Sequence, residues 1–219
     1  SRSGGSPPNH AGAVPVPAWA LHSGPAARTS PTKGSEVSDP IHWVLGTVTR
    51  ADAHGRLADG VAAHLRASLP DDHIVLARYA PRDRGERIPV VVIGRQGLFV
   101  IETRDEVGDL VCYQDHWYRR LGPGIAHALA DSPSLRARRN AARVRSDLGT
   151  GGFLNVPISA MVLLTRGTAE DVRSSCVPVL AGTDMLVRHL LHGIVETPAP
   201  ERTRSLAEAL ARNIRLSVV

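Results

Sequence analysis

The sequence contains almost no lysine. Of its 26 lysine and arginine residues, Lys33 is the single lysine and the other 25 are arginines. Because an arginine side chain stays protonated in proteins, any Schiff-base or other lysine-dependent chemistry would have to use Lys33. The chain therefore carries its positive charge almost entirely as planar guanidinium groups, which pair well with carboxylates and phosphates.

Cysteines, aromatic residues and long apolar runs are also scarce. The two cysteines, Cys112 and Cys176, are too few and too far apart for a disulfide framework or a zinc motif. Aromatic residues make up 4% of the 219 positions. The sequence shows neither a transmembrane run nor a signal-peptide pattern. We expect a cytoplasmic protein that does not contact a membrane.

The balance of charge suggests an acidic partner. The formal net charge is +5, and the sequence pI is about 10.0. Such a balance is typical of proteins that bind nucleic acid. An arginine-biased composition gives the same numbers without any partner, so charge alone leaves both interpretations open.

The chain divides into a tail and one domain. Residues 1–40 collect proline, glycine and serine without a helical or alternating period, which predicts a disordered tail. We expect residues 41–219 to form a single domain, a size that suits one hydrophobic core.

The ordered part predicts helices packed on a sheet. An apolar stripe over residues 56–69 indicates an amphipathic helix that ends at Pro70. Residues 88–93 and 98–103 are apolar strands joined in a hairpin through residues 94–97, and we expect strands 110–113 and 116–120 to extend the same sheet. Further expected elements are strands 73–79 and 157–164 and helices 135–148, 183–192 and 200–216. The apolar period of helix 135–148 places Arg136, Arg139, Asn140 and Arg143 on its outer face. This order predicts an α/β sandwich with a central mixed sheet.

The hairpin also resembles a known family. Residues 88–104, IPVVVIGRQGLFVIETR, are similar to the core of the nuclease-related domain (NERD), a branch of the PD-(D/E)xK restriction-endonuclease-like superfamily. Residues 54–65 resemble the first helix of that family, residues 132–142 resemble a later helix, and Trp117 matches a family tryptophan. The resemblance covers about residues 55–190. It implies a restriction-endonuclease-like three-layer sandwich.

The resemblance implies metal-dependent phosphodiester hydrolysis, in which carboxylates hold Mg²⁺ or Mn²⁺ against the scissile phosphate. Glu102 occupies the position of the motif glutamate, and Arg104 occupies that of the motif lysine. Because they are two residues apart on a strand, both side chains share one face. Glu102 is the retained motif carboxylate that would bind a metal in an active enzyme.

Three other motif positions depart from the family pattern. Pro89 stands where the family has a metal-binding aspartate, Arg56 where the first helix carries a glutamate, and Arg136 where the later helix carries a glutamine. Proline has no oxygen ligand to offer, and arginine places positive charge where a cation should bind. We therefore predict an inactive domain, a pseudo-enzyme that requires no cofactor.

The same substitutions suggest a replacement function. We expect Arg56, Arg104 and Arg136 to gather around the former metal cleft, and Arg139 and Arg143 to continue a basic face along the later helix. An arginine-lined cleft of this kind would bind DNA, RNA or another phosphate-bearing partner.

Two alternatives remain open. The first is an active nuclease that uses Mg²⁺ or Mn²⁺ with relocated ligands, for which Asp83 and Glu86 in the preceding loop are candidates. The second is a protein-interaction or scaffold module that contacts a protein partner through the tail and the exposed arginines. The oligomeric state is not indicated by the sequence.

Aromatic residues near 113–118 have two interpretations. Tyr113, Trp117 and Tyr118 could stack on bases, but their alternation along strands favours packing. Cys112 and His116 lie in the same stretch, where the spacing favours a tight hairpin over a metal corner.

Overall fold

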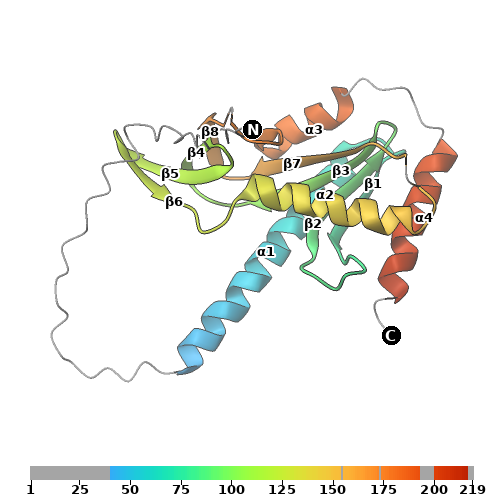
Figure 1. Cartoon of the computed structure of the whole chain (residues 1–219), viewed down its shortest axis with the longest axis horizontal. Helices are drawn as coiled ribbons and strands as arrows, with labels where there is room; N and C mark the ends of the chain where they lie inside the picture. The colour runs from blue at the N-terminus through green and yellow to red at the C-terminus, as the bar shows by residue number, and fades with distance from the viewer. Residues whose placement is uncertain (1–39, 154, 173, 193–199, 217–219) are drawn as a thin grey trace, which may run out of the picture.

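The computed structural model describes residues 40–153, 155–172, 174–192 and 200–216 (Figure 1). The expected disordered tail lies outside the described residues, apart from Pro40. The elements follow the chain in the order α1 (Pro40–Ser68), β1 (Ile74–Tyr79), β2 (Ile88–Gly94), β3 (Gly97–Arg104), β4 (Gly108–Tyr113), β5 (His116–Gly122), β6 (Ile125–Ala128), α2 (Pro133–Gly149), β7 (Ile158–Leu164), β8 (Gly167–Asp171), β9 (Val179–Ala181), α3 (Thr183–His192) and α4 (Pro200–Leu216).

A five-stranded mixed sheet forms the centre of the molecule. Its order is β1-β2-β3-β7-β9, with antiparallel pairs on the β1 side and parallel pairs from β3 onward. The predicted hairpin is confirmed, since β2 ends at Gly94 and β3 begins at its partner Gly97. Gly97 has a φ of +123°, and a Cβ there would lie 2.5 Å from the carbonyl oxygen of Pro157. This close approach requires glycine.

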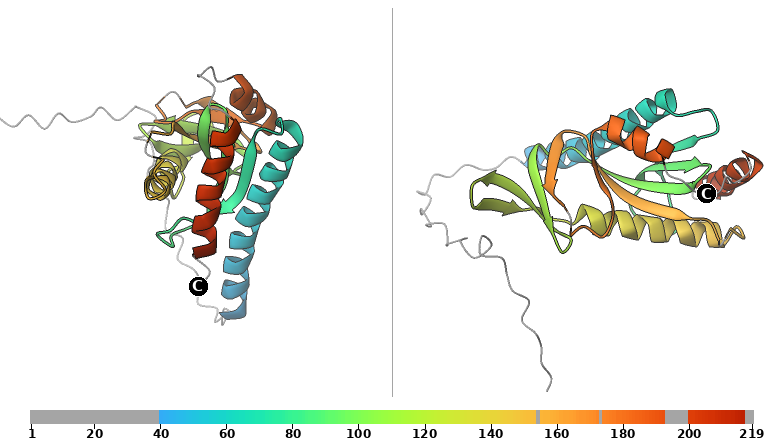
Figure 2. Two further views of the ribbon diagram at one scale, coloured as in Figure 1. Left: turned by 90° about the vertical axis from the view of Figure 1, so that its right-hand side faces the viewer. Right: turned by 90° about the horizontal axis from the view of Figure 1, so that it is seen from above.

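Helices cover both faces of this sheet (Figure 2). On one face, Leu65 of α1 and Leu186 of α3 pack against Val92 and Ile101. On the other face, apolar residues of α2 and α4 pack against the opposite side of the same strands, including Val144, Leu148, Leu206, Leu210, Val91 and Val100. The strand residues alternate between the two cores, as a doubly buried sheet requires. The expected three-layer α/β sandwich is confirmed.

A second, four-stranded sheet corrects one expectation. Residues 110–113 and 116–120 form the hairpin of β4 and β5, but this hairpin does not extend the central sheet. It belongs to a separate sheet of order β6-β5-β4-β8. The reason is that β3 already has β2 and β7 as neighbours, so β4 continues past the end of β3 and pairs in parallel with β8. Leu110 and Trp117 of this sheet pack in their own cluster with Ala137 of α2.

The helix boundaries agree in part with the sequence. Helix α1 ends at Ser68, before Pro70, but begins at Pro40 instead of residue 56. Helix α2 starts where Ser132 accepts a hydrogen bond from the backbone N–H of Leu135, with proline at the start of its first turn. No helix in the described part of the chain has the length and apolar character needed to cross a membrane.

Candidate functional site

The candidate site lies where the two sheets meet. Glu102 and Arg104 are at the end of β3, and Arg136 projects from the first turn of α2. A cleft of about 570 Å³ opens beside them and is also bordered by Ala53 and His54 of α1. The resemblance placed a catalytic centre at this point of the fold, and the structure brings Glu102, Arg104 and Arg136 together there.

Glu102 is almost completely enclosed by nitrogen donors. Its side chain is 2% exposed, and its Oε1 lies 3.2 Å from Nε of Arg136. Asn140 donates from Nδ2 to the other oxygen, Oε2, at 3.2 Å, and Nη1 of Arg104 lies 3.9 Å from Oε1. Burial raises the pKa of Glu102 to about 7, although Arg136 and Arg104 act in the opposite direction. Both carboxylate oxygens are therefore engaged within the protein.

Arg104 is buried between two other carboxylates. Its Nη1 and Nη2 donate to Asp131 at 2.9 and 2.7 Å in a bidentate pair. Its Nε and Nη2 donate to Glu106 at 3.1 and 2.7 Å. The hydrogen bond from Arg104 is the main reason that the pKa of Asp131 is lowered. Arg104 thus ties the end of β3 to the segment that leads into α2.

Arg136 touches three carboxylates at once. Its Nη2 lies 2.6 Å from Glu86, its Nε 3.2 Å from Glu102 and its Nη1 3.3 Å from Asp131. Its side chain is 29% exposed, and its contact with Glu102 places the guanidinium between α2 and the end of β3. The expectation that it faces outward is wrong, since it lies at the edge of the buried helix face and its long side chain reaches Glu102.

Asn140 was also expected on the outer face of α2. It is buried instead, one turn beyond Arg136, and accepts a hydrogen bond from Nη1 of Arg143 at 3.2 Å while donating to Glu102. Burial of an amide is tolerated where its polar atoms have partners. The amide of Asn140 therefore fixes the orientation of the Glu102 carboxylate.

The residues at this centre do not fit a divalent cation. Val90 pairs with Ile101 across the hairpin, so the register places Pro89 opposite Glu102, where no oxygen ligand is available. Mg²⁺ and Mn²⁺ need several oxygen ligands, but the oxygens of Glu102 face N–H donors. Among the described residues, no group of three or more histidine, cysteine, aspartate or glutamate side chains has a metal-binding arrangement.

The candidate replacement ligands are also paired with arginines. Asp83 forms a bidentate pair with Arg143, with both N–O distances at 2.7 Å. The hydrogen bond from Arg143 lowers the pKa of Asp83 to about 2. Glu86 is bound to Arg136 through its carboxylate, and its backbone carbonyl accepts from Arg143 at 2.8 Å. The loop 81–87 is thereby fastened along α2.

The predicted arginines occupy different surroundings. Arg56 is exposed on α1 and does not line the cleft that contains Arg104 and Arg136, because α1 reaches that cleft through Ala53 and His54. Arg143 holds the loop. Arg139 is exposed on α2 and forms no ion pair within the described part of the chain.

Charges in the cleft nearly cancel. Its walls carry three arginines and three carboxylates, namely Arg104, Arg119, Arg136, Asp105, Glu106 and Asp131. Glu102 and Glu86 add further acidic groups beside Arg136. The arginines of the cleft therefore lie among at least as many acidic side chains.

Sequence reasoning missed Glu106, Asp131 and Asn140 as members of this centre. Glu106 is two residues after Arg104, and side chains two residues apart in an extended chain lie on the same side. Asp131 directly precedes the N-cap Ser132, a position that brings it to the first turn of α2. Asn140 stands one turn beyond Arg136 on the same helix.

The aromatic candidates have mostly structural surroundings. Trp117 is buried, and its Nε1 donates to Ser134 at 3.0 Å, while the Ser134 hydroxyl donates to Asp115 at 2.6 Å. The tight hairpin expected at residues 112–116 is confirmed, with Gln114 and Asp115 at φ of 50° and 62°. Packing is therefore the role of Trp117.

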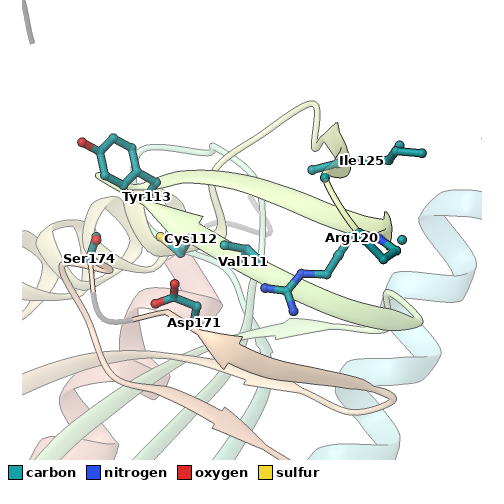
Figure 3. Close-up of a pocket in the computed structure, with 11 residues that line it drawn as sticks. Val111, Cys112, Tyr113, Arg120, Ile125, Asp171 and Ser174 are labelled. Atoms are coloured by element: carbon teal, nitrogen blue, oxygen red, sulfur yellow. The ribbon is translucent and has the colours of Figure 1, made fainter. Parts of the chain in front are cut away.

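A second cavity, of about 550 Å³, lies at the second sheet (Figure 3). Tyr113 of β4 and Ile125 of β6 line it. Arg120 and Asp171 also line it, from β5 and β8, the two strands that flank β4. Cys112 also borders it, but burial raises the pKa of its thiol to about 11. A thiol with so high a pKa is a poor nucleophile at neutral pH.

Comparison with known families agrees with the motif resemblance and with the geometry of the β2–β3 hairpin. The family model described as "Nuclease-related domain", NERD, matches residues 56–165 of the 219. No curated protein and no solved structure matched the chain in the corresponding comparisons. The matched region begins in α1, contains Glu102, Arg104 and Arg136, and extends past β7. The chain belongs to the nuclease-related domain family.

Proposed function

We propose that this domain binds nucleic acid without hydrolysing it. The observation that carries the proposal is the contact between Arg136 and Glu102, with 3.2 Å between Nε and Oε1. A guanidinium group stands at the retained motif carboxylate, which in a metal-dependent nuclease would have to face a cation.

The loss of hydrolysis follows from the chemistry of that contact. A divalent cation accelerates phosphodiester hydrolysis because it lowers the pKa of a bound water and neutralises charge on the phosphate. A guanidinium supplies positive charge but cannot generate a hydroxide nucleophile. Glu102 has a pKa near 7, which leaves part of the population protonated at neutral pH. Neither group provides the missing metal chemistry.

Arg104 does not act as a substitute for the motif lysine. A catalytic lysine would direct its charge toward the scissile phosphate. The guanidinium of Arg104 instead donates its N–H groups to Asp131 and Glu106. A phosphate would have to displace two carboxylates to reach it.

Binding of nucleic acid is supported by charge and by family membership. The net charge of +5 resides in arginines, and arginine pairs with phosphate in a bidentate geometry. Several arginines remain exposed outside the cleft, among them Arg139 and Arg145. Such groups contact the backbone of DNA or RNA without reading its sequence.

The proposal is tested by incubating labelled single- and double-stranded DNA and RNA with the full chain. Parallel reactions contain Mg²⁺, Mn²⁺ or a chelator, and Glu102→Ala is the matched variant. We expect salt-dependent binding with intact nucleic acid in every condition. Cleavage that requires metal and is lost in Glu102→Ala would instead establish an active nuclease with relocated ligands.

A protein-interaction role has one observation in its favour. Leu121 and Ile125 flank the β5–β6 turn and are 64% and 61% exposed. Exposed apolar side chains that lie together are typical of contact surfaces. If the chain fails to bind any nucleic acid even at low salt, this hairpin becomes the first surface to test for a protein partner.

A further inference from the structure

Positive charge is concentrated in two segments that lie against each other. The loop 81–87 and helix α2 together hold eight arginines and three acidic residues, a net +5 that equals the net charge of the whole chain. The structure brings these segments side by side through the contacts of Arg143 with Asp83 and of Arg136 with Glu86. Charge that is divided in the sequence is thus gathered along α2 and the loop beside it.

Each acidic residue of these segments already has a partner within the protein. Asp83 is bound by Arg143 and Glu86 by Arg136. Asp147 is buried and accepts a hydrogen bond from the hydroxyl of Tyr79 at 2.7 Å. The exposed face of α2 therefore carries no acidic side chain, because its remaining exposed residues are arginine, leucine, alanine and serine.

Three arginines stay uncompensated on the loop and on the side of α2 that holds it. Arg84 and Arg87 are exposed on the loop, and Arg139 is exposed on α2. None of the three forms an ion pair with a residue in the ranges that the structure describes. Arg139 lies three residues after Arg136 and four before Arg143, so helix geometry places it on the same side of α2 as the two arginines that fasten the loop. We call Arg84, Arg87 and Arg139 the arginine ridge.

We propose that the arginine ridge binds the phosphate backbone of double-stranded nucleic acid. This inference rests on the proposed function and assigns it to a surface outside the former metal cleft. Each unpaired guanidinium releases condensed counterions when it contacts a phosphate. Arg104 and Arg136 in the cleft lack this capacity because carboxylates already hold them.

The ridge fits a duplex better than a single strand. Proteins that bind single strands stack successive bases on aromatic side chains. The loop 81–87 and α2 contain no aromatic residue. The ridge can contact the phosphate backbone of nucleic acid but has no aromatic side chain on which unpaired bases could stack. It therefore suits a duplex, in which the bases are already paired.

The test compares two triple variants with equal loss of charge. The ridge variant is Arg84→Ala with Arg87→Ala and Arg139→Ala, and the control is Arg56→Ala with Arg166→Ala and Arg188→Ala. All six arginines are exposed. The probe is a labelled 20-base-pair DNA or RNA duplex, and fluorescence anisotropy is measured over a series of salt concentrations. A thermal melt verifies that both variants fold.

We expect the ridge variant to bind at least about tenfold more weakly than the control. We also expect its slope of log K against log salt to be about 2 to 3 smaller, since each lost phosphate contact removes about 0.9. Equal weakening of both variants would overturn the ridge but leave nucleic-acid binding intact. An undiminished ridge variant would do the same. Failure of the unmodified chain to bind would overturn the proposed function itself.

Discussion

The Nε atom of Arg136 lies 3.2 Å from Oε1 of Glu102. This pair joins the helix and the strand on which the family resemblance placed two motif positions. Around it, Glu86, Asp131, Arg104 and Glu106 form a continuous network of ion pairs. The motif centre is therefore a network in which two arginines pair with four carboxylates.

Glu102→Gln should make stability less sensitive to pH. The folded-state pKa of Glu102 is about 7 against an ordinary value of 4.5, so between these values the folded state binds more protons than the unfolded state. The free energy of unfolding of the natural chain should then fall as pH rises from about 4.5 to 7, by up to about 3 kcal/mol from this group.

Urea unfolding of both proteins at pH 5 and pH 8 measures this effect. We expect Glu102→Gln to gain stability relative to the natural chain on going from pH 5 to pH 8. A difference that stays constant with pH would contradict a raised pKa at Glu102.

Arg104→Met should destabilise the fold by about 3–5 kcal/mol, because Asp131 and Glu106 would lose the partner of their partly buried charges. Arg104→Lys keeps the charge but loses the bidentate geometry, so its cost should be clearly smaller. Chemical denaturation measures both values. Equal losses in the two variants would show that the geometry of the guanidinium, and not its charge, stabilises this junction.

Ser134→Ala should weaken the contact between the second sheet and α2. The Ser134 hydroxyl accepts from Trp117 and donates to Asp115, so its removal leaves a buried indole N–H without that partner. The expected cost is about 1–3 kcal/mol. Thermal melts measure it, with Ser146→Ala on the exposed face of α2 as the control. A cost no greater than that of the control would contradict this role of Ser134.

Pro89→Asp combined with Arg136→Gln should create affinity for a metal ion. The two changes restore an oxygen ligand opposite Glu102 and remove the guanidinium from its Oε1. We expect millimolar Mn²⁺ to raise the melting temperature of the double variant and to leave that of the natural chain unchanged. A similar rise in the natural chain would mean that its own residues bind the ion.

The sequence predicts the central elements because their signals are local. The apolar runs of β2 and β3 and the stripe of α1 indicate strands and a helix without any knowledge of partners. The second sheet could not be predicted from local signals. Residues 110–113 are excluded from the first sheet because β7, which is distant in the sequence, pairs with the edge of β3. Strands as short as β9, at 3 residues, carry too little periodicity to recognise.

The family pattern indicates Glu102, Arg104 and Arg136, which the structure brings together, and Arg56, which does not line the cleft. The contacts of these residues could not be predicted. Helical periodicity alone places Arg136 and Asn140 on the outer face of α2, because it assigns every polar residue there. It contains no information on how far a long side chain such as Arg136 reaches, or on the hydrogen bond between Asn140 and a buried carboxylate. The same limit explains why Arg143 was not recognised as a loop anchor.

The most direct test of the central claim is a single measurement on a labelled duplex incubated with the full chain and Mn²⁺. Binding is read from the native gel shift and cleavage from a denaturing gel of the same samples. The proposed function predicts a shifted duplex whose strands remain intact over the whole time course. Metal-dependent strand breaks that disappear in Glu102→Ala would contradict it.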